Sequence, residues 1–382
     1  MSVWFSASAV VPALTALWHL GDAGRAWITI SVQVGFVAGA LLSALINASD
    51  RLPPPRLLAA CSALAGLCTA LIPALHAGLP ATLALRFLTG VFLAGVYPVG
   101  MKIVAGWTRE DRGVGIGLLV GAVVLGSAAP HLLRAWVPAG DWPAVLYASA
   151  LLAFAGSLLA LRFVREGPYR TPSAPFDWRY VVRIARQRDV MLANLGYLGH
   201  MWELYAMWSW VPVFLAAHFL RAGRSGSSAA FASFAVIAAG APASLLAGKL
   251  ADRWGRTTLT LVSLVTSGAC ALVAGSMFTA GTALVVALCL VWGFAVVADS
   301  AQFSACVTEL CEPRYTGTAL TFQTSLGFLL TALTIWLVPA LVRRFGWPAA
   351  FATLAVGPAV GSWAMAQLRA SPSASKLAGG RG

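Results

Sequence analysis

The chain has 382 residues, of which 59% are hydrophobic and only 10% are charged, and its formal net charge is +13. A soluble domain carries about 25% charged residues, and a single soluble core stops growing near ~300 residues. This composition therefore excludes one soluble globular domain and predicts a protein embedded in a lipid bilayer. The basic residues lie mainly in short loops between apolar runs, a pattern that orients membrane helices and argues against nucleic-acid binding.

Twelve apolar segments follow one another along the chain. Each is close to the roughly 20 residues that a helix needs to cross about 30 Å of hydrocarbon. They predict an all-α membrane protein with twelve transmembrane helices in two pseudo-symmetric six-helix halves. The first segment has no basic region before it, so we expect it to remain as a helix rather than to be cleaved as a signal peptide. The segments are residues 2–20, 26–48, 57–76, 81–106, 113–136, 142–163, 190–219, 227–249, 257–278, 281–306, 316–341 and 347–368.

The segments divide the chain into four regions. Residues 1–163 form the N-terminal half, and residues 190–369 form the C-terminal half. Between them, residues 164–189 contain six arginines and three prolines and are expected to form a cytoplasmic basic linker. Residues 370–382 are small, polar and glycine-rich, so we expect a disordered tail.

The distribution of lysine and arginine predicts the orientation. With the N-terminus inside, eighteen basic residues lie on the inner side and six on the outer side. This excess matches the positive-inside rule. The sequence therefore predicts a multi-pass protein of the bacterial inner membrane with both termini in the cytoplasm.

Six cysteines are distributed over both halves. They form no CxxC pair and most lie inside apolar runs, so we interpret them as small buried hydrophobic residues. No metal and no other cofactor is expected. These residues are Cys61, Cys68, Cys270, Cys289, Cys306 and Cys311.

A short internal repeat relates the two halves. Residues 11–14 (Val-Pro-Ala-Leu) and residues 211–214 (Val-Pro-Val-Phe) match at a spacing of two hundred residues, and an Asp-Arg pair follows both the second and the eighth segment. Repeated six-helix units are typical of secondary transporters. Extending the match backwards predicts that the natural chain begins several residues before Met1.

The loop between the eighth and ninth segments carries the clearest motif. Residues 248–256 resemble the signature G-x-x-x-D-R-x-G-R of the major facilitator superfamily, and this resemblance implies a gating loop. In the first half, prolines replace the Gly-Arg of the motif, so that copy is degenerate. The residues assigned to the two gating loops are Gly248, Asp252, Arg253, Gly255 and Arg256, together with Asp50 and Arg51.

Further stretches agree with this resemblance. Residues 86–90 are similar to the R-F-x-x-G of the family's fourth helix, and residues 109–113 and 313–317 are similar to its charged turns before helices five and eleven. The fifth segment lacks the G-P-x-x-G-G of the family's antiporters, which favours import or symport. The G-G-x-G-x-x-x-N signature of nitrate and nitrite porters is also missing, which argues against those substrates.

Buried ionisable residues are the first candidates for substrate or ion coupling, because a charge inside the bilayer is costly and needs a reason. Glu203 lies halfway along the seventh segment, where it is a candidate proton site. His200 lies three residues earlier, on the same helix face, so the two side chains are candidates for a hydrogen bond with each other. The alternative is a neutral carboxyl held structurally by a neighbouring helix.

The tenth segment offers the second acid. Asp299 and Gln302 are three residues apart and share a face. Asp299 is either a second coupling site or the partner of a basic residue in an inner loop.

Two cations lie on the fourth segment. Arg86 and Lys102 are sixteen residues apart, about 24 Å along a helix, so one small substrate cannot contact both. Arg86 is a candidate contact for an anion or for coupling. Lys102 is expected to extend to the inner surface rather than to bind a ligand.

Aromatic residues crowd the seventh segment. Trp202 and Tyr205 flank Glu203 and are candidates for a cavity wall that stacks on substrate, although membrane aromatics commonly serve packing or interfacial belts. Weaker polar candidates are Tyr97, Gln323 and His131.

These observations favour a secondary transporter that moves a small solute by alternating access, coupled to H⁺ or Na⁺, with import favoured. Efflux of a drug or metabolite by antiport is the alternative. A membrane sensor that retains the fold without transport is a further one, but the linker is too short for a signalling domain. A Walker loop, a zinc-binding spacing and a nucleophile triad are missing, which argues against an ATP-driven pump and against an enzyme. A monomer is expected.

Overall fold

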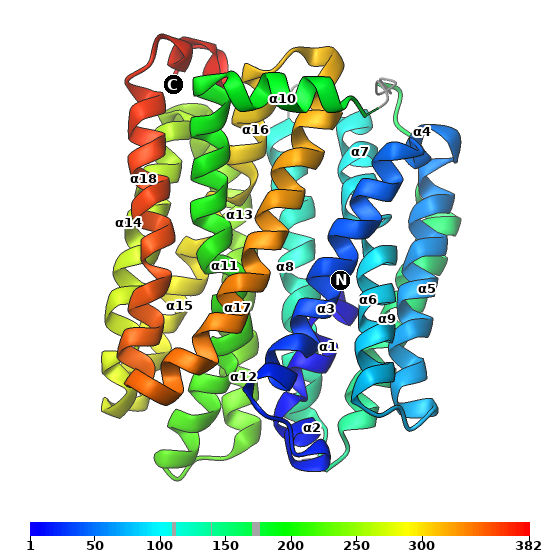
Figure 1. Ribbon diagram of the computed structural model, residues 1–382, viewed down its shortest axis with the longest axis vertical. Helices are drawn as coiled ribbons and strands as arrows, with labels where there is room; N and C mark the ends of the chain where they lie inside the picture. The colour runs from blue at the N-terminus through cyan, green and yellow to red at the C-terminus, as the bar shows by residue number, and fades with distance from the viewer. Residues whose placement is uncertain (109–111, 139, 170–175) are drawn as a thin grey trace.

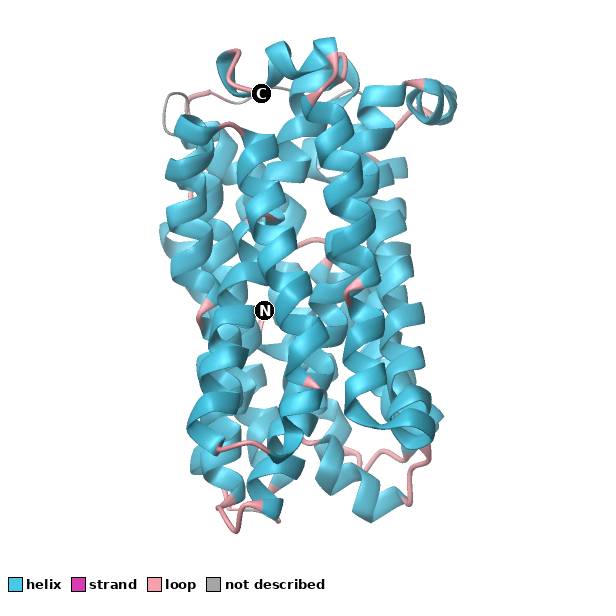
Figure 2. Cartoon of the chain, turned by 90° about the vertical axis from the view of Figure 1, so that its left-hand side faces the viewer, coloured by secondary structure: helices cyan, strands magenta, loops and turns pink. Residues whose placement is uncertain are grey.

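The computed structural model describes residues 1–108, 112–138, 140–169 and 176–382. Within these ranges the regular structure consists entirely of helices, most of which run roughly parallel as one bundle (Figures 1 and 2). The N-terminal half comprises α1 (Ser2–Ala9), α2 (Val11–Trp18), α3 (Asp22–Leu45), α4 (Ala48–Arg51), α5 (Pro54–Ala74), α6 (Leu79–Leu93), α7 (Tyr97–Trp107), α8 (Arg112–Trp136) and α9 (Trp142–Phe163).

The linker contributes one helix, α10 (Trp178–Arg186). The C-terminal half then follows with eleven helical elements in chain order, three of them short 3₁₀ helices. They are α11 (Arg188–Arg221), α12 (Gly226–Ala238), α13 (Gly240–Trp254), α14 (Arg256–Ala274), η1 (Ser276–Thr279), α15 (Thr282–Ala298), α16 (Ser300–Leu310), η2 (Pro313–Tyr315), α17 (Thr316–Leu354), α18 (Val356–Arg369) and η3 (Pro372–Gly379).

The twelve predicted crossings are confirmed. Among the described residues, nine helical stretches are long and apolar enough to cross a membrane, and the last of them, Pro313–Arg369, is long enough for two crossings. The remaining two crossings are α1 with α2, which is broken in the middle, and α11, which is rich in polar and aromatic residues.

Several crossings are broken rather than straight. The fourth crossing changes from α6 to α7 at residues 94–96, just before Pro98, which lacks an amide hydrogen and disfavours helical backbone at the residue before it. The tenth crossing breaks at Asp299, between α15 and α16. Gly346 has a φ of 79° and separates the eleventh crossing from the twelfth. Only glycine adopts that conformation without strain.

Glycines allow the closest helix contacts within the N-terminal half. A Cβ atom at Gly90 in α6 would lie 2.1 Å from the carbonyl oxygen of Val32 in α3, and one at Gly35 would lie 2.0 Å from the carbonyl oxygen of Phe87. Membrane helices pack closely at such small residues because lipid supplies no hydrophobic force between them. These contacts fix α3 against α6.

The two halves meet along two seams, where α3 packs on α17 and α8 packs on α12 and α13. At the second seam, the hydroxyl of Ser244 in α13 donates to the carbonyl oxygen of Gly117 in α8 at 3.0 Å. The seams leave space between the halves elsewhere, and the cavity described below lies there.

The loops sort to the two ends of the bundle as the segment order predicts. One end, called the basic end here, carries α4, α10 and the C-terminus (Figure 1). There the indole of Trp107 donates to the carbonyl oxygen of Arg165 at 2.9 Å. The other end, called the opposite end, carries the turn after α2 and the turn before α12.

The two ends of the chain lie at different heights in the bundle (Figure 1). The C-terminal tail contains η3, its Leu377 is fully buried, and the hydroxyl of Ser373 donates to Asp189 at 2.5 Å. Met1 lies at mid-height, beside the cavity, rather than at the basic end (Figure 1).

Candidate functional site

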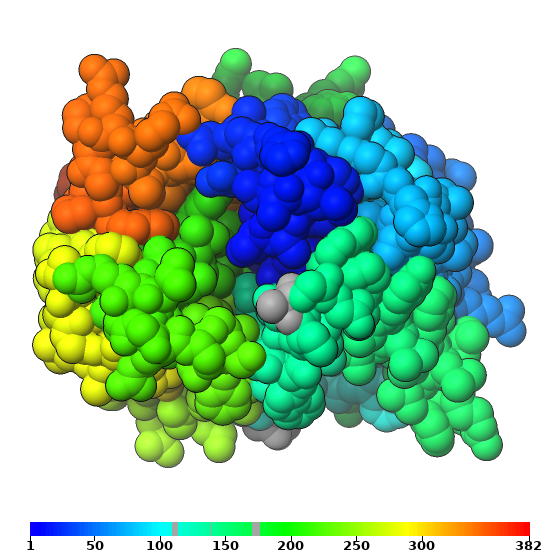
Figure 3. All heavy atoms as spheres, turned by 90° about the horizontal axis from the view of Figure 1, so that it is seen from below, coloured from blue at the N-terminus to red at the C-terminus, as the bar shows by residue number. Residues whose placement is uncertain are grey.

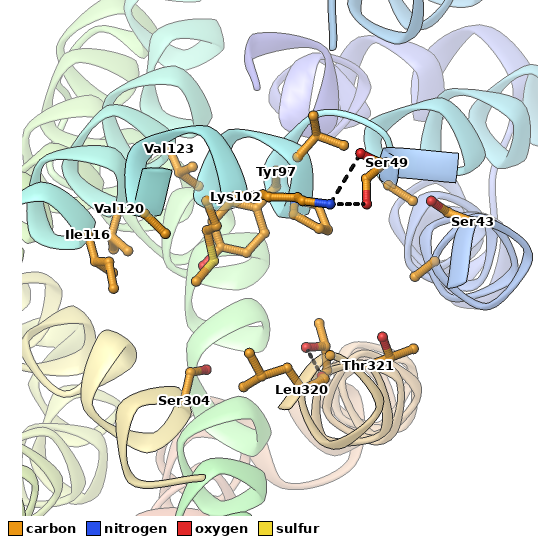
Figure 4. Close-up of a pocket in the computed structure, with 18 of the residues that line it drawn as sticks. Ser43, Ser49, Tyr97, Lys102, Ile116, Val120, Val123, Ser304, Leu320 and Thr321 are labelled. Atoms are coloured by element: carbon orange, nitrogen blue, oxygen red, sulfur yellow. Dashed lines mark hydrogen bonds between the residues drawn. The ribbon is translucent and has the colours of Figure 1, made fainter. Parts of the chain in front are cut away.

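A cavity of about 910 Å³ lies between the two halves. Its walls come from α3, α7 and α8 on one side and from α11, α16 and α17 on the other, as Figure 4 shows. Residues of the basic-end loops, such as Glu166 and Arg314, also line it, so the cavity reaches that end of the bundle. Its polar lining includes Ser43, Asn47, Ser49, Tyr97, Lys102, Ser300, Ser304, Thr308, Thr321 and Thr324.

Lys102 is a cation in the wall of this cavity. Its ammonium group lies 2.6 Å from a carboxylate oxygen of Asp50. It also donates to the hydroxyl of Ser49 at 3.3 Å (Figure 4). The side chain is 19% exposed, so it is held in this wall rather than extended into water. Asp50, assigned to a gating loop from the sequence, is therefore the partner of Lys102.

An aromatic layer closes the cavity on the side away from the basic end. The rings of Phe36 in α3 and Phe328 in α17 lie 4.5 Å apart, and Trp4 lies 5.3 Å from Phe328 and 5.8 Å from Tyr205. Each of these contacts joins one half to the other. The layer comprises Trp4, Phe5, Phe36, Tyr205, Trp208 and Phe328.

The opposite end is closed beyond this layer. Figure 3 shows residues near the N-terminus lying between the C-terminal and N-terminal helices on that face. An ion pair between Asp22 of α3 and Arg343 of α17 also joins the halves there. The structure is thus open towards the basic end and closed towards the other.

Glu203 is completely buried and does not line the cavity. One carboxylate oxygen accepts from the indole of Trp292 at 2.7 Å, and the other accepts from the hydroxyl of Ser267 at 2.8 Å. Both donors are neutral and come from helices of the same half, α15 and α14. The acid therefore lies inside the C-terminal half, behind the cavity wall formed by α11.

His200 pairs with Asp299 instead of with Glu203. Its Nδ1 atom lies 2.9 Å from a carboxylate oxygen of Asp299, and both side chains are 1% exposed. Asp299 occupies the break between α15 and α16. The next residue, Ser300, lines the cavity. The candidate hydrogen bond between His200 and Glu203 is therefore not the one that forms, and His200 instead links α11 to the broken tenth crossing.

Gln302 belongs to a different cluster, at the basic end. Arg256 of the gating motif donates to the side-chain oxygen of Gln302 at 2.8 Å and binds both oxygens of Glu309, at 2.6 and 2.8 Å. The tail covers this cluster, since the amide of Ala378 donates to Glu309 at 3.1 Å. Gly255 ends α13 with a φ of 85°, which positions Arg256 at the start of α14.

The other gating residues lie near this cluster or at the corresponding loop of the first half. Arg381 of the tail donates to the carbonyl oxygen of Asp252. Arg253 and Arg51 are exposed. Gly248 is buried in α13. The charged turn at residues 109–113 lies almost wholly outside the described residues.

Arg86 is completely buried and is also away from the cavity lining. Its guanidinium donates to three carbonyl oxygens, those of Val3 at 2.6 Å, Ile28 at 3.2 Å and Trp4. The described contacts thus tie α6 to α1 and α3 through backbone acceptors. This arrangement suits packing, and the buried guanidinium lies away from the cavity in which a solute would bind.

The two aromatic candidates on α11 lie in different surroundings. Tyr205 lines the cavity, whereas Trp202 donates to the carbonyl oxygen of Thr353 at 3.0 Å and packs between helices of the C-terminal half. Of the weaker candidates, Tyr97 lines the cavity, and Gln323 accepts from the cavity residue Ser304 at 3.1 Å. His131 is buried in α8.

Sequence reasoning missed several contributors. Trp292, Ser267 and Glu309 lie in or near apolar runs, and their polar groups within such runs were the available signal. Trp4, Phe36 and Phe328 carry no such signal because aromatic residues are common throughout the chain.

Outside the spans, burial raises the pKa of the Cys311 thiol to about 11, so this thiol is neutral at physiological pH.

Comparisons with known proteins agree with this architecture. A sequence profile described as Major Facilitator Superfamily matches residues 1–333 and, in a second match, residues 193–382. The "Putative niacin/nicotinamide transporter NiaP" of Bacillus subtilis (strain 168) is 29% identical over 215 residues, which are 54% of this chain. The match spans 52% of that relative's length. The crystal structure of a D-xylose-proton symporter superposes with a TM-score of 0.71 at 15% identity, covering 96% of this chain and 94% of the other, and thus shows the same fold.

Proposed function

Because the chain belongs to the Major Facilitator Superfamily, we propose that it is a secondary active transporter and that the cavity between its halves holds a small solute. The basic end would face the cytoplasm of a bacterial cell, in agreement with the charge of its loops. The two halves would rock about the cavity so that it opens to one side at a time.

The observation that carries this proposal is the shape of the cavity. It has a volume of about 910 Å³, within the range of ~300–1,000 Å³ that is usual for small-molecule sites. It reaches the basic end, and aromatic contacts between the halves close its other side. Alternating access requires a cavity between two halves that is closed at one end while it is open at the other.

The lining favours an aromatic solute with a polar group. Rings of Trp4, Tyr205 and Phe328 line one part of the cavity, and hydroxyls with Lys102 line the other. Aromatic faces stack on a planar ring, and the ammonium and hydroxyl groups bind a carboxylate or an amide. The resemblance to a protein named for niacin and nicotinamide supports solutes of this kind.

Proton-coupled import is the transport mode that we propose. Glu203 is the first candidate for the proton site. A charged carboxylate is costly inside the membrane, and its two hydrogen-bond donors are neutral, so binding a proton removes that cost. The pair of His200 and Asp299 is the second, because it lies directly behind Ser300 in the cavity wall.

The test is uptake of labelled nicotinate and nicotinamide into proteoliposomes that contain the full chain. Uptake should exceed that of empty liposomes and should rise when a pH gradient, acidic outside, is imposed. Equal signals from protein-containing and empty liposomes across a panel of small aromatic acids and amides would contradict the proposed substrate class. A signal that ignores pH but follows a Na⁺ gradient would contradict proton coupling.

A further inference from the structure

The linker helix α10 (Trp178–Arg186) differs from every crossing in its direction and its composition. It lies across the basic end, roughly perpendicular to the bundle (Figure 1). Its sequence, Trp-Arg-Tyr-Val-Val-Arg-Ile-Ala-Arg, alternates arginines with apolar residues at helical spacing. Such a helix has one apolar face and one basic face, which is the composition of helices that lie in a membrane interface.

The buried face of α10 binds the protein through two residues. Tyr180 and Ile184, four residues apart, are buried against the basic end. The ring of Tyr180 stacks on Tyr315 at 4.2 Å, and its hydroxyl accepts from the amide of Glu312 at 3.0 Å. These contacts hold α10 against the segment that begins α17.

The other face of α10 is exposed and basic. Arg179, Arg183 and Arg186 follow one another at spacings of four and three residues, and all three are exposed. Trp178 and Val182 are 58% and 55% exposed near the same face. Water solvates the arginine side chains well, but it solvates the apolar side chains of Trp178 and Val182 poorly. The headgroup region of a bilayer accepts both kinds of side chain.

The nearby carboxylates do not neutralise this face. Asp177 caps α10 by accepting from the amide of Arg179 at 2.8 Å, and Asp189 accepts from Ser373 in the tail. Glu312 lies 2.9 Å from Arg183. Among the ion pairs of the described residues, none involves Arg179 or Arg186.

From these features, we propose that the exposed face of α10 is a binding site for anionic phospholipid headgroups in the leaflet at the basic end. Arg179 and Arg186 bind the headgroup phosphate, and Trp178 with Val182 lies among the glycerol and upper acyl groups. Charge complementarity selects this occupant, because a basic face at the level of the headgroups meets anionic lipid first.

The site also has a route to the cavity. The amide of Asp177 donates to the hydroxyl of Thr318 at 3.2 Å, and Thr318 lines the cavity in α17. A lipid that orders α10 therefore steadies the mouth of the cavity. This consequence is independent of which solute the cavity holds.

The experiment is a titration of the purified full-length protein in neutral detergent with phosphatidylglycerol and, separately, phosphatidylcholine, with bound lipid counted by native mass spectrometry. We expect tighter binding of phosphatidylglycerol to the wild type. Since each cation near an anionic surface contributes about 1 kcal/mol, the double variant Arg179→Gln with Arg186→Gln should bind it roughly thirtyfold more weakly.

Two controls make this test specific. The pair Arg221→Gln with Arg224→Gln removes the same charge from exposed positions at the opposite end, and it should retain wild-type binding. Arg179→Lys with Arg186→Lys keeps the charge and should keep most of the binding. Unchanged phosphatidylglycerol affinity in the α10 glutamine variant would overturn the proposal, and so would an equal loss in the opposite-end control.

Discussion

Substitution of Glu203 tests whether its carboxyl couples transport to a proton or only packs the C-terminal half. In Glu203→Gln the amide oxygen still accepts from Trp292, and the amide nitrogen donates to the hydroxyl of Ser267, so the contacts persist. The variant has no titratable proton. We expect uptake driven by a pH gradient to fall to the level of empty liposomes, while exchange of internal for external solute continues.

The matched control keeps the carboxyl and removes one donor. Trp292→Phe leaves a buried carboxylate oxygen without its partner, which costs about 1–3 kcal/mol of stability, but it retains the titrating group. Its unfolding temperature should fall while the response to the pH gradient persists. Full pH-driven uptake by Glu203→Gln would remove Glu203 from coupling and leave it a structural role.

The residues of the candidate site were only partly predictable. Burial of Glu203 and Asp299 follows from their place in apolar runs. The neighbours of each side chain depend on how α11 is rotated about its axis. That rotation cannot be deduced from a single sequence. His200 therefore binds Asp299 from a distant segment rather than Glu203 from the next turn.

At the scale of helices, the α3–α6 contact depends on glycine. A Cβ atom at Gly90 would lie 2.1 Å from the carbonyl oxygen of Val32, and backbone cannot yield as a flexible side chain does. We expect Gly90→Ala to destabilise the protein by about 1–3 kcal/mol, measured as a lower thermal unfolding midpoint in detergent.

Gly156 supplies the control for this substitution. It lies in α9, and a Cβ atom there would meet nothing within 4 Å. Gly156→Ala should leave the unfolding midpoint unchanged or raise it, because alanine favours helix by about 1 kcal/mol. Equal midpoints for both variants would show that the close approach of α3 and α6 relaxes without cost.

The sequence predicts helices well and their breaks poorly. Apolar run length locates the twelve crossings because the bilayer sets one length for all of them. The breaks at Val10 and Asp299 lie inside residues 2–20 and 281–306, each of which the apolar pattern predicts as one continuous crossing. The helix α10 lies inside a segment expected to be only a loop, since nine residues are too few for a hydropathy window to register.

For the whole molecule, the question is what holds the cavity closed at the opposite end. The ion pair of Asp22 with Arg343 joins the halves there, but its side chains are 27% and 72% exposed. Exposed pairs contribute about 0–1 kcal/mol. The ring contacts of Phe328 with Phe36 and Trp4 join the halves and are buried, so they supply most of the closure.

Phe36→Ala should therefore open the opposite end far more than Asp22→Asn does. Removing a buried phenylalanine costs about 3–5 kcal/mol, and each 1.4 kcal/mol lost specifically from the closed state changes its population about tenfold. Population is read from labelling of Ser43→Cys, a cavity position, by an impermeant maleimide added only at the opposite end, after replacement of the six native cysteines. Labelling should be fast with Phe36→Ala and close to background with Asp22→Asn. The reverse order would mean that charge, rather than aromatic packing, controls which side the cavity opens to.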